Sequence, residues 1–221
     1  MELSGSEFVV HTGSPEGSNR SFRADLVVHG GGRTADIEDM SLDTGNVAAG
    51  KRGVQVNEFL QSVTNAAVYA AGDAADTAGP PLTPVAGYEG RIAAENMLDG
   101  NHSRPSYEGV ASVVFTIPPL AMAGLTEEAA KKRGHQFRTH FAETAGWYSS
   151  RRIGEAVSGF KILIEEKTDL ILGAHLLGHG VEELINVFSL ALKMRISARD
   201  LGSALYAYPT LGSNIGYMIS Q

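Results

Sequence analysis

The sequence contains no cysteine, and this absence removes several kinds of chemistry at once. Without a thiol, the chain forms no disulfide, no thiolate metal site and no cysteine nucleophile of its own. Basic residues are also scarce, with 18 Lys and Arg against 25 Asp and Glu, which gives a formal net charge of −7. An acidic balance argues against a nucleic acid or an anionic membrane as the main partner.

Long apolar runs are missing as well. No stretch approaches the roughly 18 apolar residues needed to cross a bilayer. The first five residues have neither a basic region nor an apolar region, so no secretory signal is visible. We therefore expect a cytoplasmic protein without a membrane partner. The hydrophobic fraction of 43% and the charged fraction of 19%, over 221 residues, are typical of a globular protein with one large or two small domains.

The first half of the chain predicts short strands separated by loops. Residues 7–12 have strand composition, and residues 24–29 form a short apolar run of the kind found in a buried strand. Residues 53–56 and 67–71 read as two further strands. A helix is then predicted to about residue 98.

The start of that helix has recognisable signals. Thr83 can cap it, and Pro84 suits the first helical position, where its missing N–H would have no partner. Residues 99–105 contain Gly, Ser and Pro and read as a linker, so we place a domain boundary there.

The second half predicts an antiparallel sheet with helices packed on one side. Within residues 159–165, Phe160, Ile162 and Ile164 share one face, as in a half-buried strand. Thr126 is the predicted cap of a short helix that ends before Gly134. The strands expected in this half are 110–115, 137–142, 159–165 and 170–177. The longest predicted helix, 181–194, carries an apolar stripe of Val181, Leu184, Ile185, Phe188 and Leu192.

Three stretches, in this order, resemble the flavin-dependent pyridine nucleotide–disulfide oxidoreductases, the family of glutathione, lipoamide and mercuric reductases. Residues 67–73, Ala-Val-Tyr-Ala-Ala-Gly-Asp, followed by the Leu-Thr-Pro-Val-Ala of 82–86, resemble the second flavin-binding motif. Residues 113–129 resemble the opening of the interface domain, and the Tyr-Pro-Thr of 208–210 lies where the family has His-Pro-Thr. The resemblance covers most of the chain from about residue 24.

The family resemblance also shows what is missing. Members begin with a Gly-x-Gly-x-x-Gly turn that binds the FAD pyrophosphate, and they carry a redox-active cysteine pair and a second glycine-rich turn for NAD(P)H. None of these is present here. The resemblance therefore implies an α+β chain that corresponds to the C-terminal half of such an enzyme. Residues 1–40 would end the NAD(P)-binding domain, 41–102 would close the FAD-binding domain, and 103–221 would form the dimerisation domain.

The flavin-binding motif implies a set of cofactor-binding residues. In the family, the aspartate at the position of Asp73 accepts hydrogen bonds from a ribityl hydroxyl of FAD. The free N–H groups at the start of the following helix would point at the flavin, where the helix dipole favours negative charge. The alternative for Asp73 is an aspartate that only forms a turn, whereas at residues 83–85 an ordinary helix start and a flavin contact are compatible. The expected cofactor-binding residues are Gly72, Asp73, Leu82, Thr83, Pro84, Val85 and Ala86.

Tyr208 and Ser213 occupy the positions of the family's catalytic histidine and glutamate. Histidine titrates near pH 6.5 and tyrosine near pH 10, so Tyr208 would mainly donate a hydrogen bond. Ser213 has no carboxylate with which to orient an imidazole. The dithiol acid–base mechanism is therefore not carried over to this chain. The alternative is that Tyr206 and Tyr208 only pack in an interface.

The resulting hypothesis is the C-terminal portion of an FAD-dependent oxidoreductase. Its parent would be a homodimer that passes electrons from NAD(P)H through the flavin to an unidentified acceptor and serves cell redox homeostasis. We expect this chain alone to be inactive. The competing hypothesis is a non-catalytic, truncated dimerisation module.

No metal site is expected from the histidines. His175 and His179 are four residues apart, but they span a strand end and a turn with no third ligand. The His-Gly-Gly-Gly of 29–32 matches an esterase turn, but the Gly-x-Ser-x-Gly nucleophile motif is absent.

Overall fold

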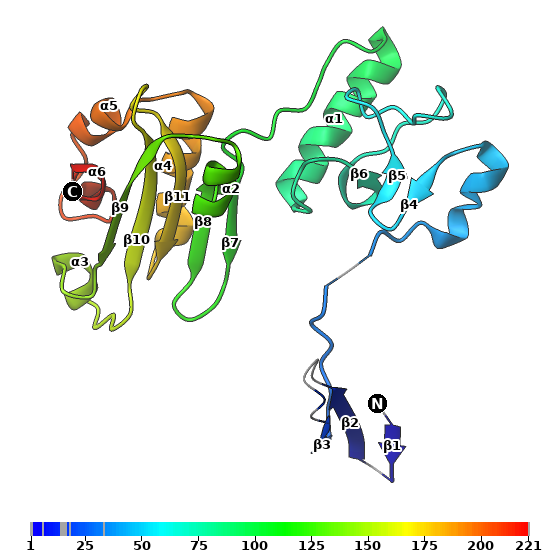
Figure 1. The fold of residues 1–221 in the computed structure, drawn as a ribbon, viewed down its shortest axis with the longest axis horizontal. Coiled ribbons are helices and arrows are strands. Elements are labelled where there is room, and N and C mark those ends of the chain that lie inside the picture. Colours follow the sequence, from blue (N-terminus) through cyan, green and yellow to red (C-terminus); the bar gives the residue numbers. More distant parts are fainter. Residues whose placement is uncertain (1, 6, 14–16, 18, 33, 221) are drawn as a thin grey trace.

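The computed structural model places three groups of elements along the chain, joined by extended segments (Figure 1). An N-terminal sheet is followed by a small mixed sheet with one long helix, and then by a larger sheet with several helices. The structure describes residues 2–5, 7–13, 17, 19–32 and 34–220.

The N-terminal group is a three-stranded antiparallel sheet in the order β1-β2-β3. Its strands are β1 (Glu2–Ser4), β2 (Glu7–Gly13) and β3 (Asn19–Ala24), and β2 confirms the strand predicted at 7–12. The strand predicted at 24–29 is wrong, because the chain leaves the sheet at Ala24. An apolar run becomes a buried strand only beside a sheet that covers it, and Leu26 and Val28 remain exposed among the described residues.

The middle group contains the predicted strand 53–56, observed as β5 (Gly53–Gln55). β5 pairs antiparallel with β4 (Ala49–Gly50) and parallel with β6 (Ala75–Asp76). Two 3₁₀ helices, η1 (Glu38–Met40) and η2 (Leu42–Gly45), precede these strands.

The strand predicted at 67–71 is wrong. Only an isolated bridge between Gln61 and Tyr69 forms there. The Asn65 side chain accepts a hydrogen bond from the Ala67 N–H at 3.0 Å and closes a turn. The backbone bonds that flank the bridge, from Ser62 N–H to the Val68 carbonyl oxygen and from Ala70 N–H to the Leu60 carbonyl oxygen, do not extend into a strand. A 3₁₀ helix, η3 (Gly72–Ala74), follows this segment.

The long helix α1 (Thr83–Asp99) confirms the helix predicted from residue 83. Its N-cap residue is Leu82 rather than Thr83, and Pro84 lies second in the helix. Leu82 has the extended backbone typical of an N-cap residue, and Pro84 in the first turn removes an N–H that would have no acceptor within the helix. The chain from 100 to 110 then runs without regular structure to the C-terminal group.

The C-terminal group is built on a five-stranded antiparallel sheet in the order β7-β8-β11-β10-β9. Four of its strands confirm the strands predicted from the sequence, and β8 was not predicted. The strands are β7 (Ala111–Val114), β8 (Leu120–Gly124), β9 (Phe137–Glu143), β10 (Gly159–Glu165) and β11 (Ile171–Leu177).

The missed strand β8 reads Leu-Ala-Met-Ala-Gly, which has little of the β-branched and aromatic content that marks strands. Its burial explains this composition. Ala121 and Ala123 are fully buried in the same core cluster as α4 (Val181–Lys193), and small side chains allow the helix to lie close to the sheet.

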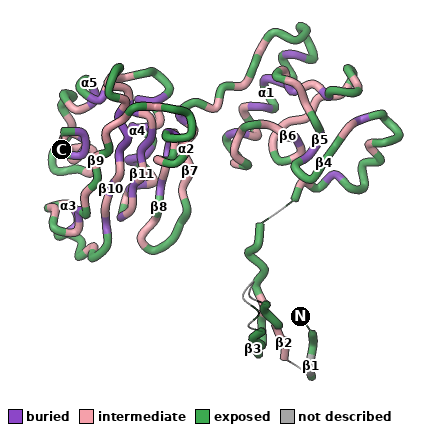
Figure 2. Tube along the Cα trace, viewed as in Figure 1, coloured by how far each residue is buried: buried purple, intermediate pink, exposed green. Residues whose placement is uncertain are grey.

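The core of this group lies between the sheet and α4. The predicted stripe on α4 is confirmed, because all five of its residues are buried. Figure 2 shows the buried residues concentrated on α4 and the central strands. The shorter helices are α2 (Glu127–Lys132), α3 (Tyr148–Arg151), α5 (Ala198–Ser203), η4 (Gly212–Asn214) and α6 (Ile215–Ser220).

Helix α2 contacts the face of the sheet opposite to the one that packs against α4. Thr126 caps it as predicted, accepting a hydrogen bond from the Ala129 N–H at 3.1 Å. Glu127 in its first turn bonds Lys161, and Lys161 points away from the face on which its neighbour Phe160 joins the α4 core.

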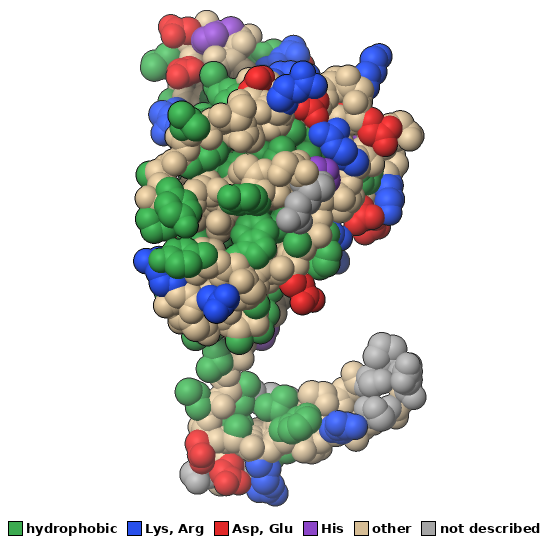
Figure 3. Space-filling view, turned by 90° about the vertical axis from the view of Figure 1, so that its left-hand side faces the viewer, with side chains coloured by type: hydrophobic (Ala, Val, Ile, Leu, Met, Phe, Trp, Pro, Cys, Tyr) green, Lys and Arg blue, Asp and Glu red, His purple; other side chains and the backbone are tan. Residues whose placement is uncertain are grey.

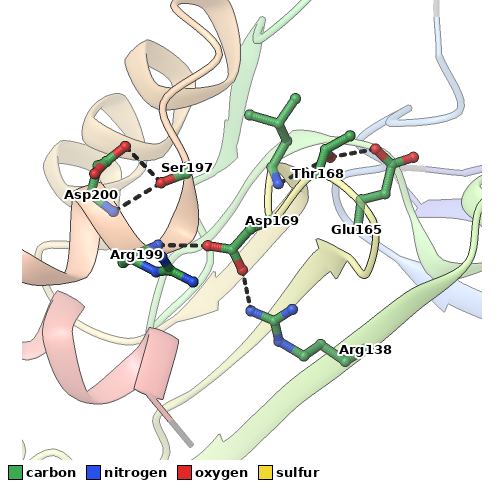
Figure 4. A network of polar contacts seen from close by, with 8 residues as sticks. Arg138, Glu165, Thr168, Asp169, Ser197, Arg199 and Asp200 are labelled. Carbon is green, nitrogen blue, oxygen red and sulfur yellow. Dashed lines mark hydrogen bonds and ion pairs between the residues drawn. The ribbon is translucent and has the colours of Figure 1, made fainter.

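A polar network ties three segments of this group together (Figure 4). The Asp169 carboxylate accepts hydrogen bonds from the Arg138 guanidinium on β9 and from the backbone N–H of Arg199 at the start of α5. Ser197 caps α5 by accepting the Asp200 N–H at 3.0 Å. The hydrogen bond from Arg138 is the main reason that the pKa of Asp169 lies below its usual value.

Candidate functional site

The candidate site is a cavity of about 280 Å³ between η3, the loop that follows β6, and the start of α1. Five of the seven predicted cofactor-binding residues line it. These are Gly72, Asp73, Leu82, Val85 and Ala86. Thr83 and Pro84 are not among the lining residues, although they lie in the first turn of the same helix.

Gly72 lets the turn approach the helix closely. Its φ of +65° is in the left-handed region that favours glycine. A Cβ atom at this position would lie 2.8 Å from the Cβ of Ala86, so a side chain has no room. The turn then presents Asp73, which is exposed, at the cavity.

Two electropositive groups face the cavity beside the carboxylates of Asp73 and Glu89. No side chain of the described chain caps α1, and the N–H groups of Thr83 and Val85 have no acceptor within the helix. Lys51 and Arg52 line the cavity as well. Arg52 is held in place by Asp76 at 3.1 Å, and it donates a hydrogen bond to the Thr77 carbonyl oxygen. An anionic or electron-rich ligand suits this environment.

Glu89 is the residue that the sequence analysis missed. It lies on α1, is only 1% exposed and lines the cavity. One carboxylate oxygen accepts the Gly72 N–H at 2.7 Å. The other accepts the hydroxyls of Thr77 at 2.9 Å and Tyr107 at 2.6 Å. Its position gave a signal, since 82, 85, 86 and 89 fall on one helical face and only the last is charged.

Tyr107 responds to this environment. Burial, and then its hydrogen bond to the Glu89 carboxylate, raise the pKa of Tyr107 to about 12. The tyrosine therefore stays a neutral donor at any physiological pH.

Tyr208 and Ser213 lie in a second cavity, of about 330 Å³, in the C-terminal group. Tyr208 is 79% exposed, whereas the Ser213 hydroxyl donates to the Thr210 carbonyl oxygen at 2.6 Å. The structure therefore brings the two predicted residues to one cavity but does not pair them with each other. The other lining residues include Trp147, Tyr148, Arg152 and Tyr217.

The surface around this second cavity is apolar and aromatic. Figure 3 faces α3, α5 and α6 and shows hydrophobic side chains gathered there. Leu205, Tyr208, Tyr217 and Tyr148 are all more than half exposed. Tyr206 differs from these, because its hydroxyl bonds the Leu201 carbonyl oxygen and its ring packs against the core.

The histidines have structural contacts. A His175 ring nitrogen lies 3.1 Å from the Leu125 carbonyl oxygen, and a His135 ring nitrogen lies 2.8 Å from the Glu165 carboxylate. Within the part of the chain that the structure describes, no group of three or more His, Asp or Glu side chains is arranged to hold a metal ion. In the same residues, no helix is long and apolar enough to span a membrane.

Comparison with known proteins defines the class. Residues 110–219 match the dimerisation domain of the pyridine nucleotide-disulphide oxidoreductases, and residues 4–90 match a second domain description of the same family. The chain belongs to the pyridine nucleotide–disulfide oxidoreductase family, which depends on FAD and NAD(P)H.

Individual relatives extend this result. The chain is 44% identical to an uncharacterised 19.7 kDa protein of the mercuric resistance operon of Staphylococcus aureus, over 81% of this chain and all of that protein. It is 30% identical to the mercuric reductase of Bacillus cereus, over 90% of this chain but 31% of the enzyme. The HOCl-induced flavoprotein disulfide reductase RclA of Escherichia coli has a similar fold, with a TM-score of 0.83, 22% identity, and coverage of 99% of this chain and 48% of that one.

The chain therefore spans all of one short relative, about a third of the mercuric reductase and about half of the reductase of known structure.

Proposed function

We propose that this chain supplies one wall of the FAD site and the dimerisation surface of an FAD-dependent NAD(P)H oxidoreductase. The observation that supports it most directly is the cavity at Gly72, Asp73 and the start of α1. Residues 1–40 would belong to the NAD(P)-binding domain, 41–102 to the FAD-binding domain and 103–221 to the dimerisation domain. We place the protein in the cytoplasm, with neither nucleic acid nor membrane as a partner.

The residues present fit FAD. The turn at Gly72 leaves no room for a side chain, so its backbone can approach a flat ring or a ribityl chain. Bound FAD would supply hydride and electron transfer from NAD(P)H to an acceptor. Asp73 would accept a hydrogen bond from a ribityl hydroxyl, and the α1 N-terminus would stabilise negative charge on the pyrimidine edge.

Tyr208 and Ser213 do not form an acid–base pair in this proposal. The Ser213 hydroxyl is engaged by the Thr210 carbonyl oxygen, and a serine has no carboxylate with which to orient a partner. We assign Tyr208 instead to the contact between two copies of the chain, because Tyr, Trp and Arg are enriched in the energetic centres of interfaces. The acceptor that finally takes the electrons is not assigned.

The flavin contact is tested by titrating FAD with the purified chain and following flavin fluorescence. Asp73→Asn should raise the dissociation constant about tenfold, which corresponds to about 1.4 kcal/mol for one hydrogen bond to a charged acceptor. Asp99→Asn, at the far end of the same helix, is the matched control and should leave the constant unchanged. Equal affinity of the Asp73→Asn variant and the unchanged chain would refute the assignment.

The second candidate function is a non-catalytic dimerisation module. The observation in its favour is the Staphylococcus aureus relative of 19.7 kDa, which this chain covers completely. A colourless dimer that neither binds FAD nor oxidises NAD(P)H would support the module. A yellow protein that consumes NAD(P)H would exclude it.

A further inference from the structure

The buried carboxylate of Glu89 accepts three hydrogen bonds at the candidate site. It joins α1 to three segments that are distant in sequence, namely the turn at Gly72, the loop at Thr77 and the segment at Tyr107. Among the described residues, no Lys, Arg or His forms an ion pair with it. A buried carboxylate without a cation is stable only when hydrogen bonds saturate it, and here three donors do so.

We propose that Glu89 is a positioning residue that sets the Gly72–Asp73 turn for the flavin and couples it to the segment that enters the dimerisation domain. This inference rests on the proposed flavin contact. The Gly72 N–H and the Tyr107 hydroxyl bond the two oxygens of the same planar Glu89 carboxylate. A shift of the segment at Tyr107 therefore moves the carboxylate, and with it the turn that presents Asp73.

A carboxylate is required for this arrangement. The three donors are divided between its two oxygens, with Gly72 on one and both Thr77 and Tyr107 on the other. A glutamine at position 89 has the same shape but only one accepting oxygen. In Glu89→Gln, either the Gly72 N–H (the turn contact) or the Tyr107 hydroxyl (the junction contact) would face an NH₂ group instead of an accepting oxygen. The substitution should therefore uncouple the turn at Gly72 from the segment at Tyr107.

The packing around the carboxylate is tight enough to transmit a displacement. A Cβ atom at Gly79 would lie 2.6 Å from the Tyr107 ring and 3.0 Å from both a Glu89 oxygen and the Val85 side chain. Groups packed this closely on one side of the carboxylate shift together rather than independently.

The first test is backbone amide hydrogen exchange in the complete chain. Glu89→Gln should accelerate exchange of the Gly72 amide at least tenfold relative to amides in the last two turns of α1. Tyr107→Phe removes only the junction contact and should accelerate the same amide about threefold. Asn96→Ala is the control, because Asn96 is equally buried on α1 but bonds the Phe59 and Ser103 backbone instead. Asn96→Ala should leave the exchange rate of the Gly72 amide, relative to those α1 amides, unchanged.

The Tyr107→Phe result keeps the test decisive if Glu89→Gln fails to fold. A Gly72 amide that exchanges at the unchanged rate in Tyr107→Phe would overturn the coupling. An unchanged rate in a folded Glu89→Gln would overturn the positioning role altogether.

The second test measures the pKa of the Tyr107 hydroxyl from its ultraviolet absorbance as a function of pH. Subtracting the titration of the Tyr107→Phe variant isolates the signal of Tyr107. In the unchanged chain the signal should titrate near the raised pKa of about 12. In Glu89→Gln it should titrate earlier, while remaining above the ordinary tyrosine pKa of 10 because burial persists. An identical titration in both proteins would contradict the contact.

The third test is FAD titration by fluorescence. Glu89→Gln should weaken FAD binding at least tenfold and Tyr107→Phe about threefold, whereas Asn96→Ala should not weaken it. If the unchanged chain does not affect FAD fluorescence, the proposed flavin contact fails. The exchange and titration results would still decide whether Glu89 positions the turn.

Discussion

Gly72 and Ala86 lie so close that a Cβ atom on Gly72 would come within 2.8 Å of the Ala86 Cβ. Gly72 also has a positive φ of +65°. Gly72→Ala should therefore destabilise the chain by about 1–3 kcal/mol, through backbone strain and the forced separation of η3 from α1. Urea unfolding measures the change.

Gly87→Ala is the matched control for this substitution. Gly87 lies within α1 and a Cβ atom there meets nothing within 4 Å. Replacing it should stabilise the chain by about 0.5–1 kcal/mol, because glycine is a poor helix former. Equal effects of the two substitutions would contradict the close approach of turn and helix.

The core of the dimerisation domain should depend strongly on Phe188. Its ring is completely buried between α4 and the sheet, and Phe188→Ala should cost about 3–5 kcal/mol by leaving a cavity. Leu190, two residues further on the same helix, is 58% exposed, and Leu190→Ala should change the stability by less than about 0.5 kcal/mol. A loss below about 1 kcal/mol for Phe188→Ala, measured by denaturant unfolding, would refute this packing.

The Asp169 network should make stability depend on pH in the acid range. Because the folded pKa of Asp169 lies below its usual 3.8, its charge stabilises the fold above that pH. This contribution is lost as the pH falls through the folded pKa. Asp169→Asn should therefore lower stability by about 1 kcal/mol near pH 7, where the pair with Arg138 is intact.

Thermal melts at several pH values check this prediction. The difference between Asp169→Asn and the unchanged chain should shrink below about pH 4. Asparagine tolerates the positive φ of +60° at this position, so the substitution tests charge rather than backbone strain. A difference that stays constant down to pH 2 would contradict the assignment.

The aromatic surface at Tyr208 should contribute to dimer formation. Tyr208→Ala should leave the stability of a single copy within about 0.5 kcal/mol, because the side chain is mostly exposed. It should raise the dimer dissociation constant at least about tenfold, as expected for an aromatic interface anchor. Sedimentation equilibrium gives the constant, and Leu98→Ala, an exposed residue on α1, is the control.

Periodicity explains which elements could be predicted from the sequence. The alternation of Phe160, Ile162 and Ile164 identified β10, and the stripe on α4 identified the helix, because both patterns follow directly from which face is buried. The strand β8 could not be found in this way. Its buried alanines leave room for α4 against the sheet, and this tertiary contact cannot be seen in the pattern of the strand itself.

The site shows the same division. The motif that ends in Gly72-Asp73 located the turn, and the proline located the start of α1. The strand predicted just before the turn was wrong, because the Asn65 side chain accepts the Ala67 N–H and the Gln61 side chain donates to the Ala66 carbonyl oxygen, which holds the start of that segment in a turn. The Glu89 carboxylate bonds Tyr107, which lies 18 residues later in the sequence. The fold of the chain between them, which brings Tyr107 against α1, has no signature in the local sequence.

The N-terminal sheet has a different consequence. None of the strand residues whose exposure is described is buried, so little apolar area is removed from water when β1, β2 and β3 pair. An isolated sheet of this kind opens locally at almost no free-energy cost and is a ready substrate for proteases. Brief trypsin treatment should therefore cut at Arg20 or Arg23 long before it reaches Arg138, whose strand is held in the large sheet. The middle and C-terminal groups should therefore outlast the N-terminal sheet in the digest.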